Sequence, residues 1–246
     1  MNGHGIDANA RLNPDGLIEA IIDFRFTHAE VPELVLGKLT DLQPGWAIDR
    51  LPMADFPAQL RRADPNLLFQ PLLQLNATDG SQTLRIGENS VSRHVLAPYP
   101  GWGDFKTDIA KTADYVLSNI KGSKITRIGL RYLNVMLPEK HKVTGIESTT
   151  LSLKISGSDI TEKLNINYQR DIGDMTVLVR LATPEFVTGP GPGFSVLIDI
   201  DVFTPPVFSV TTTNAVVEWT DRGHMSLKNE FFGLIRPEIL ADLVER

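Results

Sequence analysis

The sequence contains no cysteine among its 246 residues. This absence excludes disulfides, thiolate nucleophiles, cysteine-bound zinc and iron–sulfur clusters, and it agrees with a reducing compartment. A chain of this length buries roughly three quarters of the surface of its unfolded state, so it needs neither disulfides nor a structural metal to hold a core. We therefore expect a cytoplasmic protein that folds around an ordinary hydrophobic core.

Long hydrophobic runs are missing as well. The longest apolar runs have the length of strands and fall short of the roughly 18 to 20 residues that a membrane span requires. The opening segment, MNGHGIDANARLNPDG, is polar and glycine-rich where a secretory signal has an apolar core. We expect a soluble protein, not a membrane protein, in which residues 1–16 form a loose leader.

Positive charge is in the minority, because 24 Lys and Arg stand against 30 Asp and Glu and give a net charge of −6. Proteins that bind nucleic acid without sequence preference neutralise phosphates with Lys and Arg. The charge balance therefore argues against nucleic acid as the partner of this chain.

Motifs for metal and phosphate chemistry are absent from the sequence. The histidines show neither HxxxH nor HxH spacing, and no GxSxG, GxGxxG or kinase signature occurs. GPGPG at residues 189–193 contains two prolines, which lack the N–H groups of an anion-binding loop, so it predicts a strand connection or a flexible lid. We expect no metal and no cofactor. We interpret all five histidines as structural: His4, His28, His94, His141 and His224.

Alternating apolar and polar residues predict an α+β fold with a broad, mainly antiparallel sheet. The segment LIEAIIDFRF at residues 17–26 is typical, since its even-numbered apolar side chains share one side and Glu19, Asp23 and Arg25 share the other. Two long helices carry apolar stripes and are expected on one face of the sheet: one at about 103–120, and one that follows the Thr-rich TTTN of residues 211–214 and ends at about residue 235. Further strands are expected at 67–76, 82–86, 91–96, 124–136, 149–155, 160–170, 175–182 and 193–203, and short helices at 32–42 and from Pro237, with a Pro-punctuated loop between residues 43 and 65.

The order of the predicted elements repeats, which suggests an internal duplication. Each half runs strand, excursion, three strands and helix, so residues 17–122 form a first α+β half and residues 123–246 a second, packed as one compact unit. The closest local match pairs IIDFRF at 21–26 with RIGLRY at 127–132 and places Arg25 on Arg131.

The predicted sheet leaves one polar face, which is the first candidate site. Alternation places Arg25, Arg127 and Arg131 on this face. They are interpreted in two ways: the guanidinium groups bind an anionic ligand or a protein partner, or they pair with carboxylates of neighbouring strands such as Asp23 and Asp199.

Two further groups of side chains are candidates for ligand or partner binding. Tyr99 and Trp102, in the proline-stiffened loop HVLAPYPGW, either offer aromatic contact area to a partner or cover the end of the core. Tyr132 and Asn134 follow Arg131 closely in RIGLRYLN, and the three could line a cleft between the halves.

Three motifs carry a resemblance to a known family: GEN at 87–89, YPGW at 99–102 and GLRYLN at 129–134. With them, the first strand and the EFFGLI of the last long helix, the chain resembles over nearly its whole length a sporadically distributed family of uncharacterised bacterial and archaeal proteins of about this length. The resemblance implies mobile or accessory genes, such as defence or toxin–antitoxin systems, and it implies no catalytic residue or cofactor.

Two hypotheses for function follow from the sequence. The first is a non-catalytic protein-interaction module, antitoxin-like or a defence accessory protein, that uses the polar face or the Tyr99–Trp102 loop. The alternative is a small-molecule or nucleotide-binding protein with hydrolytic activity, in which an Arg-lined face holds a small anionic ligand. The lack of catalytic motifs favours the first and argues against an enzyme.

Overall fold

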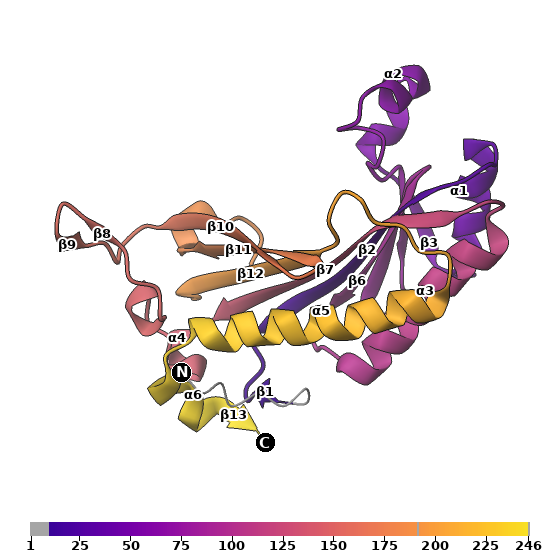
Figure 1. Cartoon of the computed structure of the whole chain (residues 1–246). Coiled ribbons are helices and arrows are strands. Elements are labelled where there is room, and N and C mark those ends of the chain that lie inside the picture. The colour runs from indigo at the N-terminus through magenta and orange to yellow at the C-terminus, as the bar shows by residue number, and fades with distance from the viewer. Residues whose placement is uncertain (1–9, 191, 246) are drawn as a thin grey trace. The chain divides into compact units, whose positions relative to one another are not determined.

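The computed structural model describes residues 10–190 and 192–245. Residues 1–9 of the expected leader and Gly191 of GPGPG lie outside this described part. The fold is α+β, and the described residues contain one nine-stranded sheet (Figure 1). Its strands neighbour one another in this order: β10 (Asn165–Ile172), β11 (Met175–Ala182), β12 (Val196–Phe203), β7 (Lys124–Met136), β2 (Leu17–Thr27), β6 (Ser90–Leu96), β5 (Gln82–Ile86), β4 (Leu73–Asn76) and β3 (Ala47–Arg50).

Antiparallel pairing runs through this sheet. The register is antiparallel between β10 and β11, between β2 and β6, and along the series β6, β5, β4 and β3. The predicted α+β class and the broad antiparallel sheet are therefore confirmed. Two small sheets accompany it in the described residues: β1 (Arg11–Leu12) with β13 (Val244–Glu245), and β8 (Lys154–Ile155) with β9 (Ser158–Asp159).

The described helices differ widely in length. None of them is both long and apolar enough to cross a membrane. The α-helices are α1 (Pro32–Thr40), α2 (Ala58–Ala63), α3 (Trp102–Asn119), α4 (Pro138–His141), α5 (Thr213–Leu234) and α6 (Pro237–Leu243), and short 3-10 turns occur at Pro52–Asp55, Ile146–Ser148 and Pro184–Phe186.

Several predicted segments differ from the structure. The strand expected at 67–76 begins only at Leu73, because the N–H groups of Leu67 and Leu68 donate to the Asp64 carbonyl and form a turn. The loop expected between residues 43 and 65 contains β3 and α2. All four residues of β3 are exposed, so it gives no alternation signal.

Two other predicted segments also differ from the structure. Of the strand expected at 149–155, only Lys154–Ile155 is a strand, since the N–H of Thr150 instead donates to the Leu234 carbonyl at the end of α5. Residues 11 and 12, expected in a loose leader, form β1, and the N–H of Asn13 donates to the Leu243 carbonyl. This part of the leader is therefore held by the main fold.

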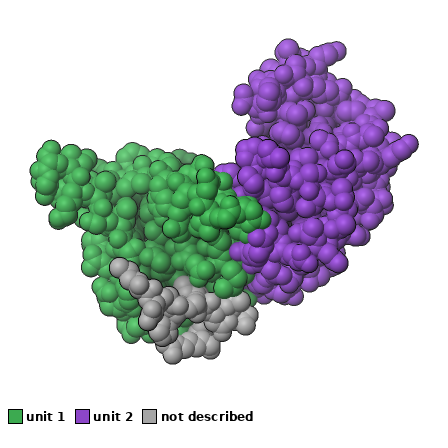
Figure 2. Space-filling view, viewed as in Figure 1, with its two compact units in different colours: residues 1–18, 131–202, 223–246 green, residues 19–130, 203–222 purple. Residues whose placement is uncertain are grey.

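The chain divides into two compact units (Figure 2). Unit 1 comprises the described residues within 1–18, 131–202 and 223–246, and unit 2 comprises residues 19–130 and 203–222. These boundaries differ from the halves 17–122 and 123–246, because β7 from the second half lies beside β2 from the first in the sheet. Each unit therefore draws on both halves of the sequence.

The core of unit 2 follows the alternation predicted from the sequence. Ala20, Ile22, Phe24 and Phe26 of β2 are fully buried, while the polar residues between them keep partial exposure. Helix α3 contributes four more fully buried apolar side chains: Phe105, Ile109, Ala113 and Val116. Burial of this apolar stripe against the sheet is the main force that holds α3 in place.

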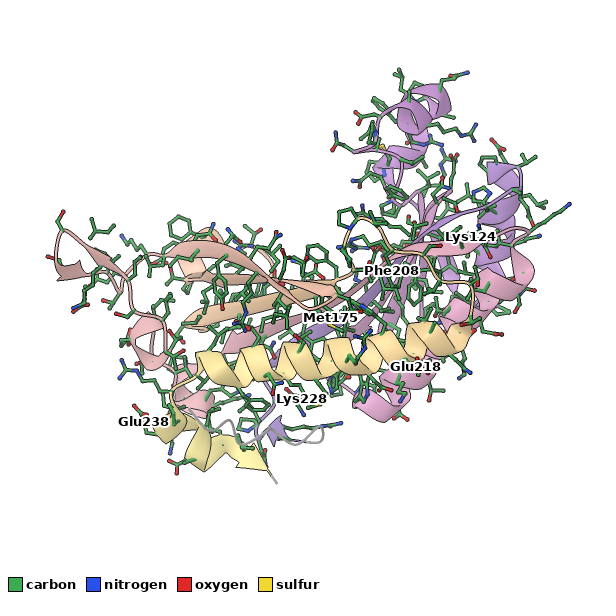
Figure 3. The ribbon with its side chains drawn as sticks, viewed as in Figure 1. Lys124, Met175, Phe208, Glu218, Lys228 and Glu238 are labelled. Atoms are coloured by element: carbon green, nitrogen blue, oxygen red, sulfur yellow. The ribbon has the colours of Figure 1, made fainter. Side chains whose placement is uncertain are left out.

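The core of unit 1 includes buried side chains of β11 and of the second half of α5. Val177, Val179 and Leu181 alternate on the buried side of β11, and Leu227 of α5 is buried as well. Met175 and Lys228, labelled in Figure 3, are both buried in this unit. The ammonium group of Lys228 lies 5.9 Å from the centre of the Phe232 ring in the same helix.

Candidate functional site

The polar side of the strands in unit 2 carries a chain of three hydrogen-bonded side chains. The Ser92 hydroxyl lies 3.0 Å from Nε2 of His94, and Nδ1 of His94 lies 2.7 Å from Oε1 of Glu19. Because a carboxylate only accepts hydrogen bonds, Nδ1 carries a proton, and in the neutral imidazole Nε2 then accepts the hydrogen bond from Ser92. We call this arrangement the Ser92–His94–Glu19 chain.

The strand register explains why these three side chains meet. Ser92 and His94 are two residues apart in β6, so both side chains project from the same side of the sheet. In the antiparallel pair of β2 and β6, Ile21 is opposite His94 and Asp23 is opposite Ser92. Glu19 is two residues from Ile21 on that same side and reaches the imidazole diagonally.

Asp23, Arg25 and Arg127 lie next to the Ser92–His94–Glu19 chain. Nη1 of Arg127 donates to Oδ1 of Asp23 at 2.8 Å, and Nε of Arg25 lies 3.8 Å from the same oxygen. Burial raises the pKa of Asp23 above its ordinary value, and the charges of Arg127 and Arg25 oppose this effect. The sequence-based interpretation in which Arg25 and Arg127 pair with neighbouring carboxylates agrees with these contacts.

Aromatic rings hold both guanidinium groups. The Arg25 guanidinium lies 4.8 Å from the centre of the Phe69 ring, and that of Arg127 lies 4.8 Å from the centre of the Phe203 ring. Such cation–π contacts add to the ion pairs with Asp23. Both arginines are therefore fixed in orientation.

Arg127 also depends on a glycine two residues away. A Cβ atom added to Gly129 would lie 2.7 Å from Nη1 of Arg127. The arginine side chain therefore folds back over a position that has room for it only because Gly129 lacks a side chain.

Unit 1 carries its own arginine–carboxylate pair, formed by Arg131 and Asp199. Nε and Nη2 of Arg131 donate to the two oxygens of Asp199 at 2.8 and 2.6 Å, which is bidentate geometry. The side chain of Asp199 is 7% exposed and that of Arg131 is 43% exposed. The carboxylate therefore lies underneath, and the guanidinium faces solvent.

Tyr132 and Asn134, which the sequence groups with Arg131, project from the opposite side of β7. The Tyr132 hydroxyl lies 3.2 Å from Nδ1 of His224 in α5, and Tyr132 is buried. Asn134 is buried too, and its amide donates to the Ile198 carbonyl at 3.5 Å. Tyr132 and Asn134 have even numbers and Arg131 has an odd number, and odd and even residues of β7 project to opposite sides. Tyr132 and Asn134 therefore belong to the core side of unit 1.

Tyr99 and Trp102 cover one end of the core of unit 2. Both rings make edge contacts with Phe105, with ring centres 6.0 and 6.3 Å apart. Nε1 of Trp102 donates to Oδ1 of Asp221 at 3.0 Å, and Lys106 binds the other oxygen of that carboxylate at 2.6 Å. The contacts agree with the interpretation in which these rings close the core and begin α3.

The GEN motif at 87–89 anchors the excursion that contains α2. Both oxygens of the buried Glu88 accept hydrogen bonds, from Nη2 of Arg61 at 3.0 Å and from Nε of Arg62 at 2.8 Å. A Cβ atom on Gly87 would lie 2.7 Å from the carbonyl oxygen of Gln70, so this turn requires glycine. The motif therefore has a structural function in unit 2.

Sequence reasoning missed the Ser92–His94–Glu19 chain. The sequence predicts a structural histidine at His94, offers Glu19 only as a polar residue of the first strand, and gives no motif at Ser92. The available signal was the pattern Ser-x-His inside a strand, which places a hydroxyl and an imidazole on one side. The carboxylate came from a strand 75 residues away in sequence, and only the register brings it into contact.

The described residues hold no group of three His, Asp or Glu side chains that is arranged to bind a metal ion. No protein-family model matches the chain, and a search of curated proteins returns no match.

Proposed function

We propose that this chain is a protein-interaction module whose polar strand surfaces bind an acidic protein partner. The single observation that supports this function is the layering of the arginine–carboxylate pairs. In unit 1 the Asp199 carboxylate is buried beneath the exposed guanidinium of Arg131. A partner that approaches this surface meets the cationic member of the pair first.

Unit 2 shows the same layering in a weaker form. The Arg25 side chain is 41% exposed and its partner Asp23 is 30% exposed. Arginine beside aromatic rings is typical of residues that dominate binding energy at protein interfaces. Because the chain as a whole carries a charge of −6, an acidic partner is repelled elsewhere and is steered toward these arginines.

Other parts of the sequence-based hypothesis belong to this proposal. The resemblance to accessory genes favours an antitoxin-like or defence accessory protein, and we expect it in the cytoplasm. We also propose that the chain arose by internal duplication, with both long helices on one face of the sheet. The comparable exposure of Arg25 and Arg131, each beside an aspartate, supports the pairing of these two positions.

Affinity capture from an extract of the native host tests the proposal. Wild type should retain a stoichiometric partner that salt elutes, and Arg131→Glu or Arg25→Glu should lose it. Lys154→Glu is the matched control, because Lys154 is an exposed cation in the small β8–β9 sheet. Failure of wild type to capture a partner, or capture by both arginine variants at the level of wild type, would contradict the proposal.

The alternative, a small anionic ligand on the same arginines, has a separate readout. Thermal-shift measurements with nucleotides and organic phosphates should give no stabilisation if the partner is a protein. A reproducible stabilisation that disappears in Arg131→Ala would instead support the small ligand.

A further inference from the structure

The Ser92–His94–Glu19 chain has the connectivity of an activated nucleophile. A hydroxyl lies within hydrogen-bond distance of an imidazole nitrogen, and the second nitrogen of that ring is bound by a carboxylate. In hydrolases such a carboxylate fixes the tautomer and orientation of the imidazole, which then accepts the hydroxyl proton. None of these three groups takes part in the proposed protein interaction.

Burial differs among the side chains of the Ser92–His94–Glu19 chain in the way that catalysis requires. His94 is buried, at 6% exposure, and Ser92 next to it is partly exposed. The imidazole is thus shielded from water while the hydroxyl remains reachable. Because all three side chains stand on hydrogen-bonded strands, their relative positions are held by the backbone ladder between β2 and β6.

A cationic side chain stands beside the serine. Arg85 of β5 is directly opposite Ser92 of β6 in the antiparallel register, and it is exposed. Nε of Arg85 donates to Oε1 of Gln74 at 3.0 Å, which orients the guanidinium. Directly opposed residues have their Cβ atoms about 4.5 to 5.5 Å apart, close enough for a guanidinium to reach an oxygen bound at Ser92.

We propose that Ser92 is a catalytic nucleophile for the hydrolysis of carboxylic esters, with His94 as general base and Glu19 as a positioning residue. Arg85 stabilises the negative charge that develops on the ester oxygen. This activity goes beyond the interaction function and does not depend on it.

The proposed reaction balances in two steps. Ser92 Oγ forms a bond to the acyl carbon while its proton passes to Nε2 of His94, and the alcohol leaves with that proton when the C–O bond of the ester breaks. Water then attacks the acyl-serine, gives a proton to Nε2 of His94, and releases the carboxylic acid as the proton returns to Ser92 Oγ. Neither step requires a metal or a redox partner.

A fluorophosphonate probe tests the nucleophile on the full chain. It forms a phosphorus–oxygen bond with an activated serine and expels fluoride, and the adduct is read by intact mass and peptide mapping. We expect one adduct, on Ser92, which is lost in Ser92→Ala and forms about a hundredfold more slowly in His94→Gln. Ser90→Ala is the matched control, because Ser90 is on the same side of β6 and donates to the Phe69 carbonyl.

Three outcomes would overturn the proposal: no adduct in wild type, an adduct that persists in Ser92→Ala, or equal labelling rates in wild type and His94→Gln. Far-ultraviolet circular dichroism of each variant shows that it is folded. In the same preparations, hydrolysis of p-nitrophenyl acetate should show a burst of p-nitrophenol, which Arg85→Ala weakens and Ser92→Ala abolishes.

Glu19 requires a readout that a purely structural function would not change. Glu19→Gln should lower the labelling rate and shift its pH profile, because only one of the two carboxylates that face His94, Asp23, remains beside the imidazole in this variant. Glu19→Asp keeps the charge and should restore part of the rate. An unchanged pH profile in Glu19→Gln would contradict the positioning function.

Discussion

The hydroxyl of Tyr132 contacts Nδ1 of His224, whereas Arg131, its neighbour in β7, binds Asp199 with Nε and Nη2 of its guanidinium group. Two successive residues of one strand thus belong to different environments. Tyr132 links the strand to α5 in the core of unit 1, and Arg131 presents its guanidinium to solvent. Substitutions at these adjacent positions should therefore have different consequences.

Tyr132→Phe should lower the free energy of unfolding by about 1 kcal/mol, because it removes a buried hydrogen bond and keeps the ring. It should leave partner capture unchanged. Arg131→Ala should abolish partner capture. Urea unfolding followed by circular dichroism, together with affinity capture, measures both effects, and loss of partner capture in Tyr132→Phe would contradict this assignment.

Glu88 should make the stability of unit 2 sensitive to acid. Burial alone would raise the pKa of Glu88, but hydrogen bonds from Arg62 and Arg61 outweigh burial and hold it below the ordinary value. A carboxylate with a lowered pKa stabilises the fold above its unfolded-state pKa, and this stabilisation is lost as pH falls through the folded-state pKa. Glu88→Gln should therefore show a smaller loss of stability than wild type between about pH 6 and about pH 3.

The same substitution should be costly near neutral pH. Glu88→Gln leaves the buried Arg61 without its carboxylate, and breaking a buried ion pair in this way costs about 3 kcal/mol. Urea unfolding curves measured across the pH range give both results. Parallel pH profiles for wild type and Glu88→Gln would show that Glu88 does not carry the acid sensitivity.

Gly129→Ala should displace Arg127. The new methyl group would occupy the position next to Nη1, so the guanidinium must leave Asp23 and the Phe203 ring, at a cost of about 1 kcal/mol. Gly37→Ala in α1 is the control, because a Cβ there has no neighbour within 4 Å and should stabilise the helix by about 0.5 to 1 kcal/mol. Thermal unfolding measures both shifts, and stabilisation by Gly129→Ala would contradict the packing argument.

Trp102→Phe should separate a structural function of the YPGW motif from a binding function. The variant keeps the ring contact with Phe105 but loses the hydrogen bond to Asp221, so we expect a loss of about 1 kcal/mol in unfolding free energy. Partner capture should not change. Weaker capture at unchanged stability would instead indicate that Trp102 contacts the partner.

Strands that have clear alternation and turn residues at both ends are predicted well from the sequence. The bounds of β5, β7 and β11 agree with those expected, because alternation and turn residues define both ends. The exposed edge strand β3 has no alternation to detect, and β1 is only two residues long and pairs with the other end of the chain. Short elements of this kind depend on tertiary contacts that a local pattern does not contain.

The candidate site was predictable only in part. Alternation correctly separates Arg127 and Arg131 from the buried side of β7. The same alternation places Tyr132 and Asn134 on that buried side, away from the two arginines. The contact between His94 and Glu19 depends on the register of two strands far apart in sequence. Register is set by the packing of the whole sheet, so the sequence alone does not indicate it.

The composition of the two units has a consequence for synthesis on the ribosome. Unit 2 requires residues 203–222, and unit 1 requires residues 223 onward, so neither can close until most of the polypeptide has emerged. Truncated expression or a single proteolytic cut cannot yield either unit intact. Nascent chains must stay unaggregated with unpaired β-strands for much of translation, which predicts dependence on chaperones when the protein is overproduced.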